Sequence, residues 1–189
     1  MPPTAETGGY ASLNGTGSLT ASAYLYNNHT TAVLARINNK NPTAYDATET
    51  QGALLVYKGY HSMFYYSATS LQYGIWNNAS AQVFAPSFSI GASDKNIEEG
   101  KWFYVTVVRS GNTLTSFING VSLGTTSFAT PVYSSLVTDT IRIGVAYDSS
   151  SQYSWHADCN VATAKMYNRA LSAAEITQNF EALRGRYGI

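Results

Sequence analysis

Alternating hydrophobic and polar positions run through much of the chain and predict β-strands. Residues 18–26, SLTASAYLY, alternate with the period of two that is expected of a strand with one buried face. Loops rich in Asn, Pro, Gly and Asp separate this segment from further predicted strand segments at 31–37, 52–67, 71–76, 141–145 and 161–168. The pattern therefore indicates an all-β chain made of many short strands.

The strongest pattern lies in the middle of the chain, where three strands are predicted to follow one another through tight turns. Residues 102–108, WFYVTVV, are aromatic or β-branched throughout, and residues 114–118 and 121–123 continue the pattern. Asn119 and Gly120 join the last two of these strands. Both residue types tolerate the positive φ that a type I′ turn requires, so a β-meander is expected here.

A single helix is predicted near the C-terminal end of the sequence. Ser172 and Glu175 have the spacing of a capping box, in which each side chain accepts a hydrogen bond from the other residue's backbone N–H. Gly185 is expected to end this helix. One stripe of apolar side chains recurs at helical spacing and is expected to face the sheets: Ile176, Phe180 and Leu183.

Many short strands with one terminal helix are typical of a β-sandwich and not of an alternating α/β chain. Residues 1–15 are rich in Pro, Gly and Thr and are interpreted as an N-terminal arm or edge segment. Residues 16–189 are predicted to form one all-β domain, in which two antiparallel sheets pack face to face and one short helix follows the last strand.

The sequence around the predicted helix resembles a known family signature. Residues 165–176, KMYNRALSAAEI, resemble the closing stretch of laminin-G-like (concanavalin A-like) jelly-roll domains, where a last strand leads into a short helix. Residues 102–108 and the Asn119–Gly120 turn are similar to the tryptophan strand of that family and the turn that follows it. The resemblance spans about residues 18–189 and implies a two-sheet antiparallel jelly-roll sandwich.

Residues 178–189, QNFEALRGRYGI, resemble the ending of such modules in structural proteins of tailed bacteriophages. This resemblance implies a location on the virion surface, as a capsid decoration or tail-associated protein. The sequence departs from the family pattern at Cys159, where glycine is common, and at Ala157, where an aromatic residue is common. Some members bind calcium through carboxylates at the rim, but no complete ligand set carries over.

Charge and composition exclude several function classes. The 189 residues include 11 Lys+Arg and 11 Asp+Glu, so the formal net charge is zero. The charged share of 12% is about half of the usual ~25%. Such a chain lacks the basic surface that nucleic-acid binding requires and is attracted only weakly to an anionic membrane. No apolar run approaches the ~18–20 residues of a spanning helix, and the start, MPPTAE, lacks the pattern of a secretion signal.

Catalytic arrangements are not evident in the sequence. Glycosidases of this broad fold use two carboxylates on one face of a strand, whereas Glu98 and Glu99 are adjacent and are expected to point to opposite faces. The nucleophile motif Gly-x-Ser-x-Gly is absent, and His29 and His61 are expected at the surface. The lone cysteine, Cys159, excludes an internal disulfide and is interpreted as a small buried side chain. We therefore predict a non-enzymatic protein with no required cofactor.

The segment 146–160 is the best candidate for a binding site. It joins two predicted strands, should lie on the rim of the sandwich, and combines flat aromatic rings with polar groups, as carbohydrate recognition requires. The candidate carbohydrate-binding residues are Tyr147, Asp148, Gln152, Tyr153, Trp155, His156 and Asp158. The structural alternative is that Trp155 fills the core and Tyr153 covers a neighbouring loop. Asp148 and Asp158 are also candidates for a calcium ion, with solvated loop carboxylates as the alternative.

A second aromatic group has several interpretations. Tyrosine is concentrated in the predicted strands between residues 57 and 73, where it is expected to form strand surface and core, or an interface between proteins: Tyr57, Tyr60, Tyr65, Tyr66 and Tyr73. The neutral, hydroxyl-rich composition favours association between like molecules. We predict a virion structural or adhesion module that self-associates and binds host-surface glycans. A free extracellular lectin is the alternative, and a glycoside hydrolase is a third reading.

Overall fold

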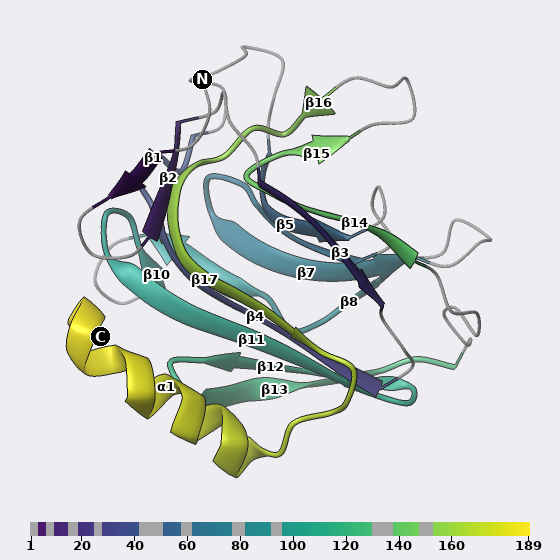
Figure 1. The fold of residues 1–189 in the computed structure, drawn as a ribbon. Coiled ribbons are helices and arrows are strands. Elements are labelled where there is room, and N and C mark those ends of the chain that lie inside the picture. Colours follow the sequence, from purple (N-terminus) through teal and green to yellow (C-terminus); the bar gives the residue numbers. More distant parts are fainter. Residues whose placement is uncertain are drawn as a thin grey trace.

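The computed structural model contains two large β-sheets that pack face to face, with one helix against the outer side of one sheet (Figure 1). The structure describes residues 4–6, 10–14, 19–24, 28–41, 51–57, 62–76, 82–91, 96–129, 138–147 and 153–189. Side chains are described for residues 28–41, 51–55, 64–75, 83–91, 96–129, 141–146 and 155–189. The predicted all-β sandwich with a short C-terminal helix is confirmed.

The first sheet has seven strands, and each pairs antiparallel with its neighbours. Their spatial order is β1 (Thr4–Glu6), β2 (Tyr10–Asn14), β17 (Asp158–Tyr167), β4 (Asn28–Ile37), β11 (Trp102–Ser110), β12 (Thr113–Ile118) and β13 (Val121–Ser127). The predicted meander is confirmed as β11–β12–β13, and Asn119 and Gly120 have φ values of 48° and 81° at its second turn. Strands β1 and β2 lie at one edge of this sheet, and the domain boundary at residue 16 stays a prediction.

The second sheet has eight strands, of which seven form one path and the eighth pairs beside it. One of the pairs is parallel and the others are antiparallel. The path runs through β10 (Ile97–Glu98), β9 (Phe88–Gly91), β7 (Ser70–Trp76), β6 (Ser62–Tyr66), β5 (Gly52–Tyr57), β14 (Thr138–Ile143) and β3 (Leu19–Tyr24), and β8 (Gln82–Phe84) pairs with β7 beside it. A separate two-stranded ribbon consists of β15 (Ala146–Tyr147) and β16 (Tyr153–Ser154). The predicted segment 52–67 thus contains two antiparallel strands, β5 and β6.

Strand β11 is buried on both of its faces. Phe103, Val105 and Val107 point into the core between the sheets. Tyr104 belongs to a second cluster with Phe180 on the outer face of the seven-stranded sheet, beneath the helix. Because both faces are covered, this strand is apolar or aromatic almost throughout instead of alternating with polar residues.

The helix α1 (Ala173–Tyr187) begins at the predicted capping box. The Ser172 hydroxyl accepts a hydrogen bond from Glu175 N, and Glu175 Oε2 accepts one from Ser172 N at 2.8 Å. The predicted end at Gly185 is wrong, because the helix continues to Tyr187 and ends at Gly188. Gly188 takes the left-handed conformation, with a φ of 69°, that the closing turn requires. Within the described residues, no helix is long and apolar enough to cross a membrane.

The prediction that His29 lies at the surface is wrong. Its side chain is only 2% exposed and points between the sheets, where Nε2 lies 3.1 Å from the Tyr73 hydroxyl. Arg109 faces it across the β4–β11 pairing and is also buried, and its Nε donates to Gly111 O. Burial lowers the pKa of Arg109. Each of these buried polar groups thus has a hydrogen-bond partner, and His61 lies outside the described residues.

Tyr66 links the two sheets near the start of β17. Its ring is fully buried, its hydroxyl donates to Asn39 O, and the same hydroxyl accepts from Asp158 N at 3.1 Å. Gly52 lies opposite Tyr66 in the β5–β6 pairing. A Cβ atom on Gly52 would lie 2.5 Å from the Tyr66 ring, so the glycine provides the space that this ring occupies. Cys159 follows directly in β17, and its predicted burial is confirmed; burial raises the pKa of its thiol.

We predict that Gly52→Ala destabilises the protein because the added methyl group collides with the Tyr66 ring. The expected loss in the free energy of unfolding is about 1–3 kcal/mol, measured by urea denaturation. Gly185→Ala is the matched control. No atom lies within 4 Å of a Cβ at that helical position, so this change should stabilise the protein by about 0.5–1 kcal/mol. Equal stability of Gly52→Ala and wild type would contradict the packing described.

We also predict that the helix cap depends on pH through Glu175. The Arg169 guanidinium, and then the Ser172 hydrogen bonds, lower the pKa of Glu175 from about 4.5 to about 2. Because the folded-state pKa is depressed, the stabilisation is complete above pH 4.5 and is lost as the pH falls toward 2. An NMR titration of the Glu175 side-chain carboxyl measures this directly. Arg169→Gln should raise the pKa, and an ordinary pKa in the wild type would refute the arrangement.

Candidate functional site

The structure places the residues of segment 146–160 in different environments. Side chains are described for Trp155, His156 and Asp158. Tyr147 and Tyr153 are described by their backbone only, and they lie opposite each other in the β15–β16 ribbon. Asp148 and Gln152 lie outside the described residues. Part of the predicted rim loop is therefore a β-ribbon that leads into Trp155.

Trp155 packs on the outer face of the eight-stranded sheet. Along β6, Phe64 and Tyr66 point into the core, so the alternation of the strand directs Tyr65 outward. The Trp155 ring lies on Tyr65 with a centroid distance of 5.9 Å and an interplanar angle of 34°. Ala53 N donates to Trp155 O at 2.7 Å, which anchors the tryptophan backbone to β5.

Two further side chains extend this contact. The Tyr65 hydroxyl donates to Gln72 Oε1 at 2.6 Å, and Phe84 packs edge-on against Tyr65 at 6.4 Å between ring centroids. Tyr65 is buried, whereas Trp155, Gln72 and Phe84 are half-buried. We name these four residues the outer-face aromatic surface. It is separate from the core between the sheets, so the alternative in which Trp155 fills that core is wrong.

The backbone of Trp155 is strained. Its φ of 54° is rare for a bulky side chain, and such a conformation costs about 1–3 kcal/mol. Asn119 is the other described non-glycine residue with a positive φ, and there the hairpin turn requires it. No such turn type explains Trp155. The strain is maintained by the hydrogen bond to Ala53 and by packing on Tyr65, and it directs the indole onto the outer face of the sheet.

The chemistry of this surface suits a neutral polar ligand. Aromatic faces pack against C–H groups, and the Gln72 carboxamide offers both a donor and an acceptor. Burial raises the pKa of Tyr65, so its hydroxyl stays protonated and keeps donating to Gln72. None of the four side chains is ionised at neutral pH, so this surface offers aromatic faces and hydrogen-bonding groups and no ionic contact.

Asp158 has a structural role away from this surface. It begins β17 in the seven-stranded sheet, where its carboxylate accepts from Asn38 Nδ2 at 3.0 Å. The same amide donates to Asn160 Oδ1, so Asp158 secures the chain that leaves β4. The described side chains contain no group of three His, Cys, Asp or Glu that could hold a metal ion. Calcium binding by Asp148 and Asp158 stays a prediction.

The adjacent carboxylates Glu98 and Glu99 have different partners. Glu98 forms an ion pair with Lys101 at 2.7 Å, and Glu99 accepts a hydrogen bond from Lys40 N. The two side chains therefore contact separate partners, and their predicted orientation to opposite faces stays a prediction.

Trp155 is among the residues that the sequence predicts for the site, but its partners are not. The sequence predicts Tyr65 as strand surface, core or protein interface, and it does not single out Gln72 or Phe84. The alternation of core residues along a strand indicates which side chains point away from the core. Tyr65 is opposite Gln72, and Phe84 is opposite Gly74, on that outer face. The pairing of these strands, which decides the neighbours, is not visible in the sequence.

The family assignment agrees with this geometry. A family model described as the concanavalin A-like lectin/glucanases superfamily matches residues 4–177. The chain belongs to this superfamily. The resemblance noted around residues 165–176 is thereby confirmed at the level of the superfamily. No curated protein matches the sequence.

Solved structures of similar fold include binding domains of toxins. The binding domain of botulinum neurotoxin serotype D has a TM-score of 0.69 and 12% identity, over 92% of this chain and 42% of that chain. The binding domain of Paraclostridial Mosquitocidal Protein 1 has a TM-score of 0.69 and 13% identity, over 92% and 43%. This superfamily member thus spans less than half the length of those chains. At this identity the likeness shows the fold alone, and the virion location stays a prediction.

Proposed function

We propose that the protein is a non-catalytic carbohydrate-binding module that recognises surface glycans through the outer-face aromatic surface. The observation that carries the proposal is the half-exposed Trp155, whose strained backbone holds its ring on Tyr65 beside the Gln72 carboxamide. Membership of a lectin and glucanase superfamily supports a saccharide as the ligand. The structural neighbours are named as binding or receptor-binding domains, which supports a binding role.

The arrangement favours binding without hydrolysis. Glycoside hydrolysis requires two carboxyl groups about 5–5.5 Å apart in retaining enzymes, or about 6.5–9.5 Å apart in inverting enzymes. The outer-face aromatic surface consists of three aromatic side chains and one carboxamide, which supply no proton donor or nucleophile of that kind. The adjacent carboxylates of Glu98 and Glu99 are held by separate partners.

A glycan array with the purified protein tests this function. We expect binding of neutral glycans, and Trp155→Ala should weaken it at least roughly tenfold, equivalent to about 1.4 kcal/mol, because the ring that covers the sugar's C–H face is removed. Phe128→Ala is the matched control, since Phe128 is a half-buried aromatic that packs near Arg109 instead. Circular dichroism checks that both variants fold. An array without hits, unchanged binding by Trp155→Ala, or release of reducing sugar from a bound glycan would refute the proposal.

The virion-surface location and self-association proposed from the sequence are compatible with such a module, which would act there as an adhesion protein. We expect mass spectrometry to find the protein in purified phage particles, and sedimentation to find an oligomer. Its absence from particles would favour a free extracellular lectin instead.

A further inference from the structure

The outer-face aromatic surface is built on a row of residues that crosses three strands. Ala53 in β5 pairs directly with Tyr65 in β6, and Tyr65 pairs directly with Gln72 in β7. Direct partners share a face, and neighbouring strands lie about 4.7–4.9 Å apart, so these side chains follow one another across the sheet. Ala53 N donates to Trp155 O at one end of the row, and the indole lies on Tyr65. The indole and the Gln72 carboxamide are therefore neighbours on one face of the sheet.

Tyr65 fixes the orientation of the Gln72 carboxamide. The Tyr65 hydroxyl donates to Gln72 Oε1 at 2.6 Å, so the acceptor of the carboxamide is already engaged within the surface. Tyr65 is 7% exposed, whereas Gln72, Trp155 and Phe84 are half-buried. A ligand on this face therefore meets these three side chains and not the phenol. The part of Gln72 that it meets is Nε2, which has two N–H donors and no acceptor.

The two exposed aromatic side chains add no acceptor. The Trp155 indole N–H is a donor only, and Phe84 has no polar atom, while their ring faces pack well against apolar C–H groups. A ligand hydroxyl that accepts from Gln72 brings a proton of its own, for which these two rings supply no partner. A carbonyl oxygen accepts without bringing a proton. The surface thus favours a ligand that carries a carbonyl beside an apolar group.

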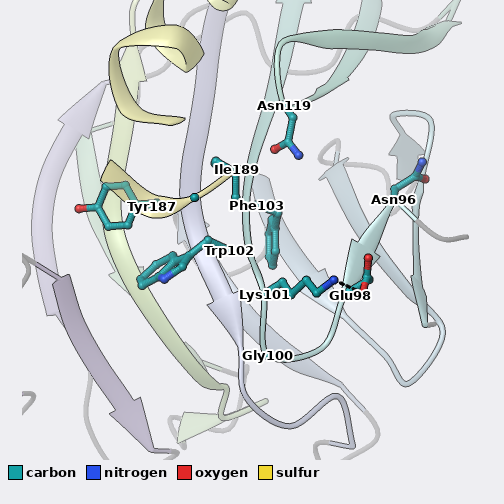
Figure 2. Close-up of a pocket in the computed structure, with 10 residues that line it drawn as sticks. Asn96, Glu98, Gly100, Lys101, Trp102, Phe103, Asn119, Tyr187 and Ile189 are labelled. Atoms are coloured by element: carbon teal, nitrogen blue, oxygen red, sulfur yellow. Dashed lines mark ion pairs between the residues drawn. The ribbon is translucent and has the colours of Figure 1, made fainter. Parts of the chain in front are cut away.

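The pocket at the C-terminal end of α1 lacks this arrangement (Figure 2). It has a volume of about 390 Å³, but its aromatic and polar side chains lie in different directions. Trp102 and Tyr187 pack on each other in the cluster beneath the helix, at 5.0 Å between ring centroids. Phe103 points into the core between the sheets, and the ion pair of Glu98 and Lys101 lies beside it. No wall of that pocket joins the aromatic pair with the polar groups.

We propose that the outer-face aromatic surface selects pyranoses that carry an N-acetyl group. Gln72 Nε2 donates to the acetamido carbonyl oxygen, and the acetyl methyl group packs against the neighbouring aromatic rings. Tyr65 is a positioning residue, because it acts through the carboxamide that it holds. The inference rests on the proposed function, since it names the class of sugar that the same surface binds.

Matched pairs of methyl pyranosides test this selectivity. Within each pair, of gluco or galacto configuration, the two sugars differ only in an acetamido or a hydroxyl group at carbon 2. In titrations of the ¹⁵N-labelled wild-type protein, the N-acetylated member of at least one pair should bind about fivefold tighter, the ordinary effect of one hydrogen bond. It should also shift the Gln72 side-chain amide signals more than the hydroxyl member does.

Gln72→Glu removes the donor and keeps the rest of the surface. The carboxylate still accepts from the Tyr65 hydroxyl but has no N–H, so the preference within the pair should disappear. Gln178→Glu is the matched control, because it makes the same change at an exposed position of α1, and it should keep the preference. Tyr65→Phe should reduce the preference, because the carboxamide can then turn its oxygen toward the ligand. Trp155→Ala should weaken both members of the pair, and circular dichroism checks that each variant folds.

The outcomes separate this inference from the proposed function. Equal affinity within every pair, no binding of either member at high millimolar concentrations, or a preference that persists in folded Gln72→Glu would overturn the inference. In each of those cases the array still decides the proposed function, through the loss of its hits in Trp155→Ala. A preference that is present in the wild type and in Gln178→Glu, and absent in Gln72→Glu, supports the inference.

Discussion

The hydrogen bonds of Tyr66 are the constraint that connects the core with the candidate binding surface. The ring is enclosed between the sheets, where only a glycine at position 52 leaves enough space, and its hydroxyl holds both Asn39 and Asp158. The start of β17 is thereby fixed to the opposite sheet. Trp155 lies three residues earlier in the chain, so its position depends on that anchor. The next residue of β6, Tyr65, points the other way and supports the indole.

Local signals in the sequence were sufficient for much of the fold. The Ser172–Glu175 box and the Asn119–Gly120 turn each depend on neighbouring residues, and both are present as predicted. The predicted end of the helix is wrong because Gly185 and Gly188 are the same residue type, and the sequence does not show which glycine ends the helix. The helix continues past Gly185, where Tyr187 packs on Trp102 and Gly188 N donates to Arg184 O. His29 was misjudged because its partner Tyr73 is 44 residues away, and nothing near His29 indicates a buried hydroxyl.

The candidate site likewise contains one residue that the sequence identifies and others that only strand pairing brings to it. Trp155 could be identified because tryptophan in a polar segment between strands is uncommon and suits ligand contact. Tyr65, Gln72 and Phe84 become its neighbours only through the pairing of β6, β7 and β8. Asp158 has the residue type of a ligand-binding group, but it accepts a hydrogen bond from Asn38 and serves the turn after β4. Residue type alone does not distinguish these two roles.

The position of β17 between β2 and β4 has a consequence for how the chain folds. The central strand β4 pairs on one side with β11 and on the other with β17, so both partners come from much later in the sequence. Closing such long loops has an entropic cost before any pairing is gained, and folds dominated by non-local contacts form slowly, over milliseconds to seconds. One edge of β4 therefore gains its partner only when β17 has been synthesised. The low charge of the chain gives an exposed strand edge little electrostatic protection against pairing with another copy.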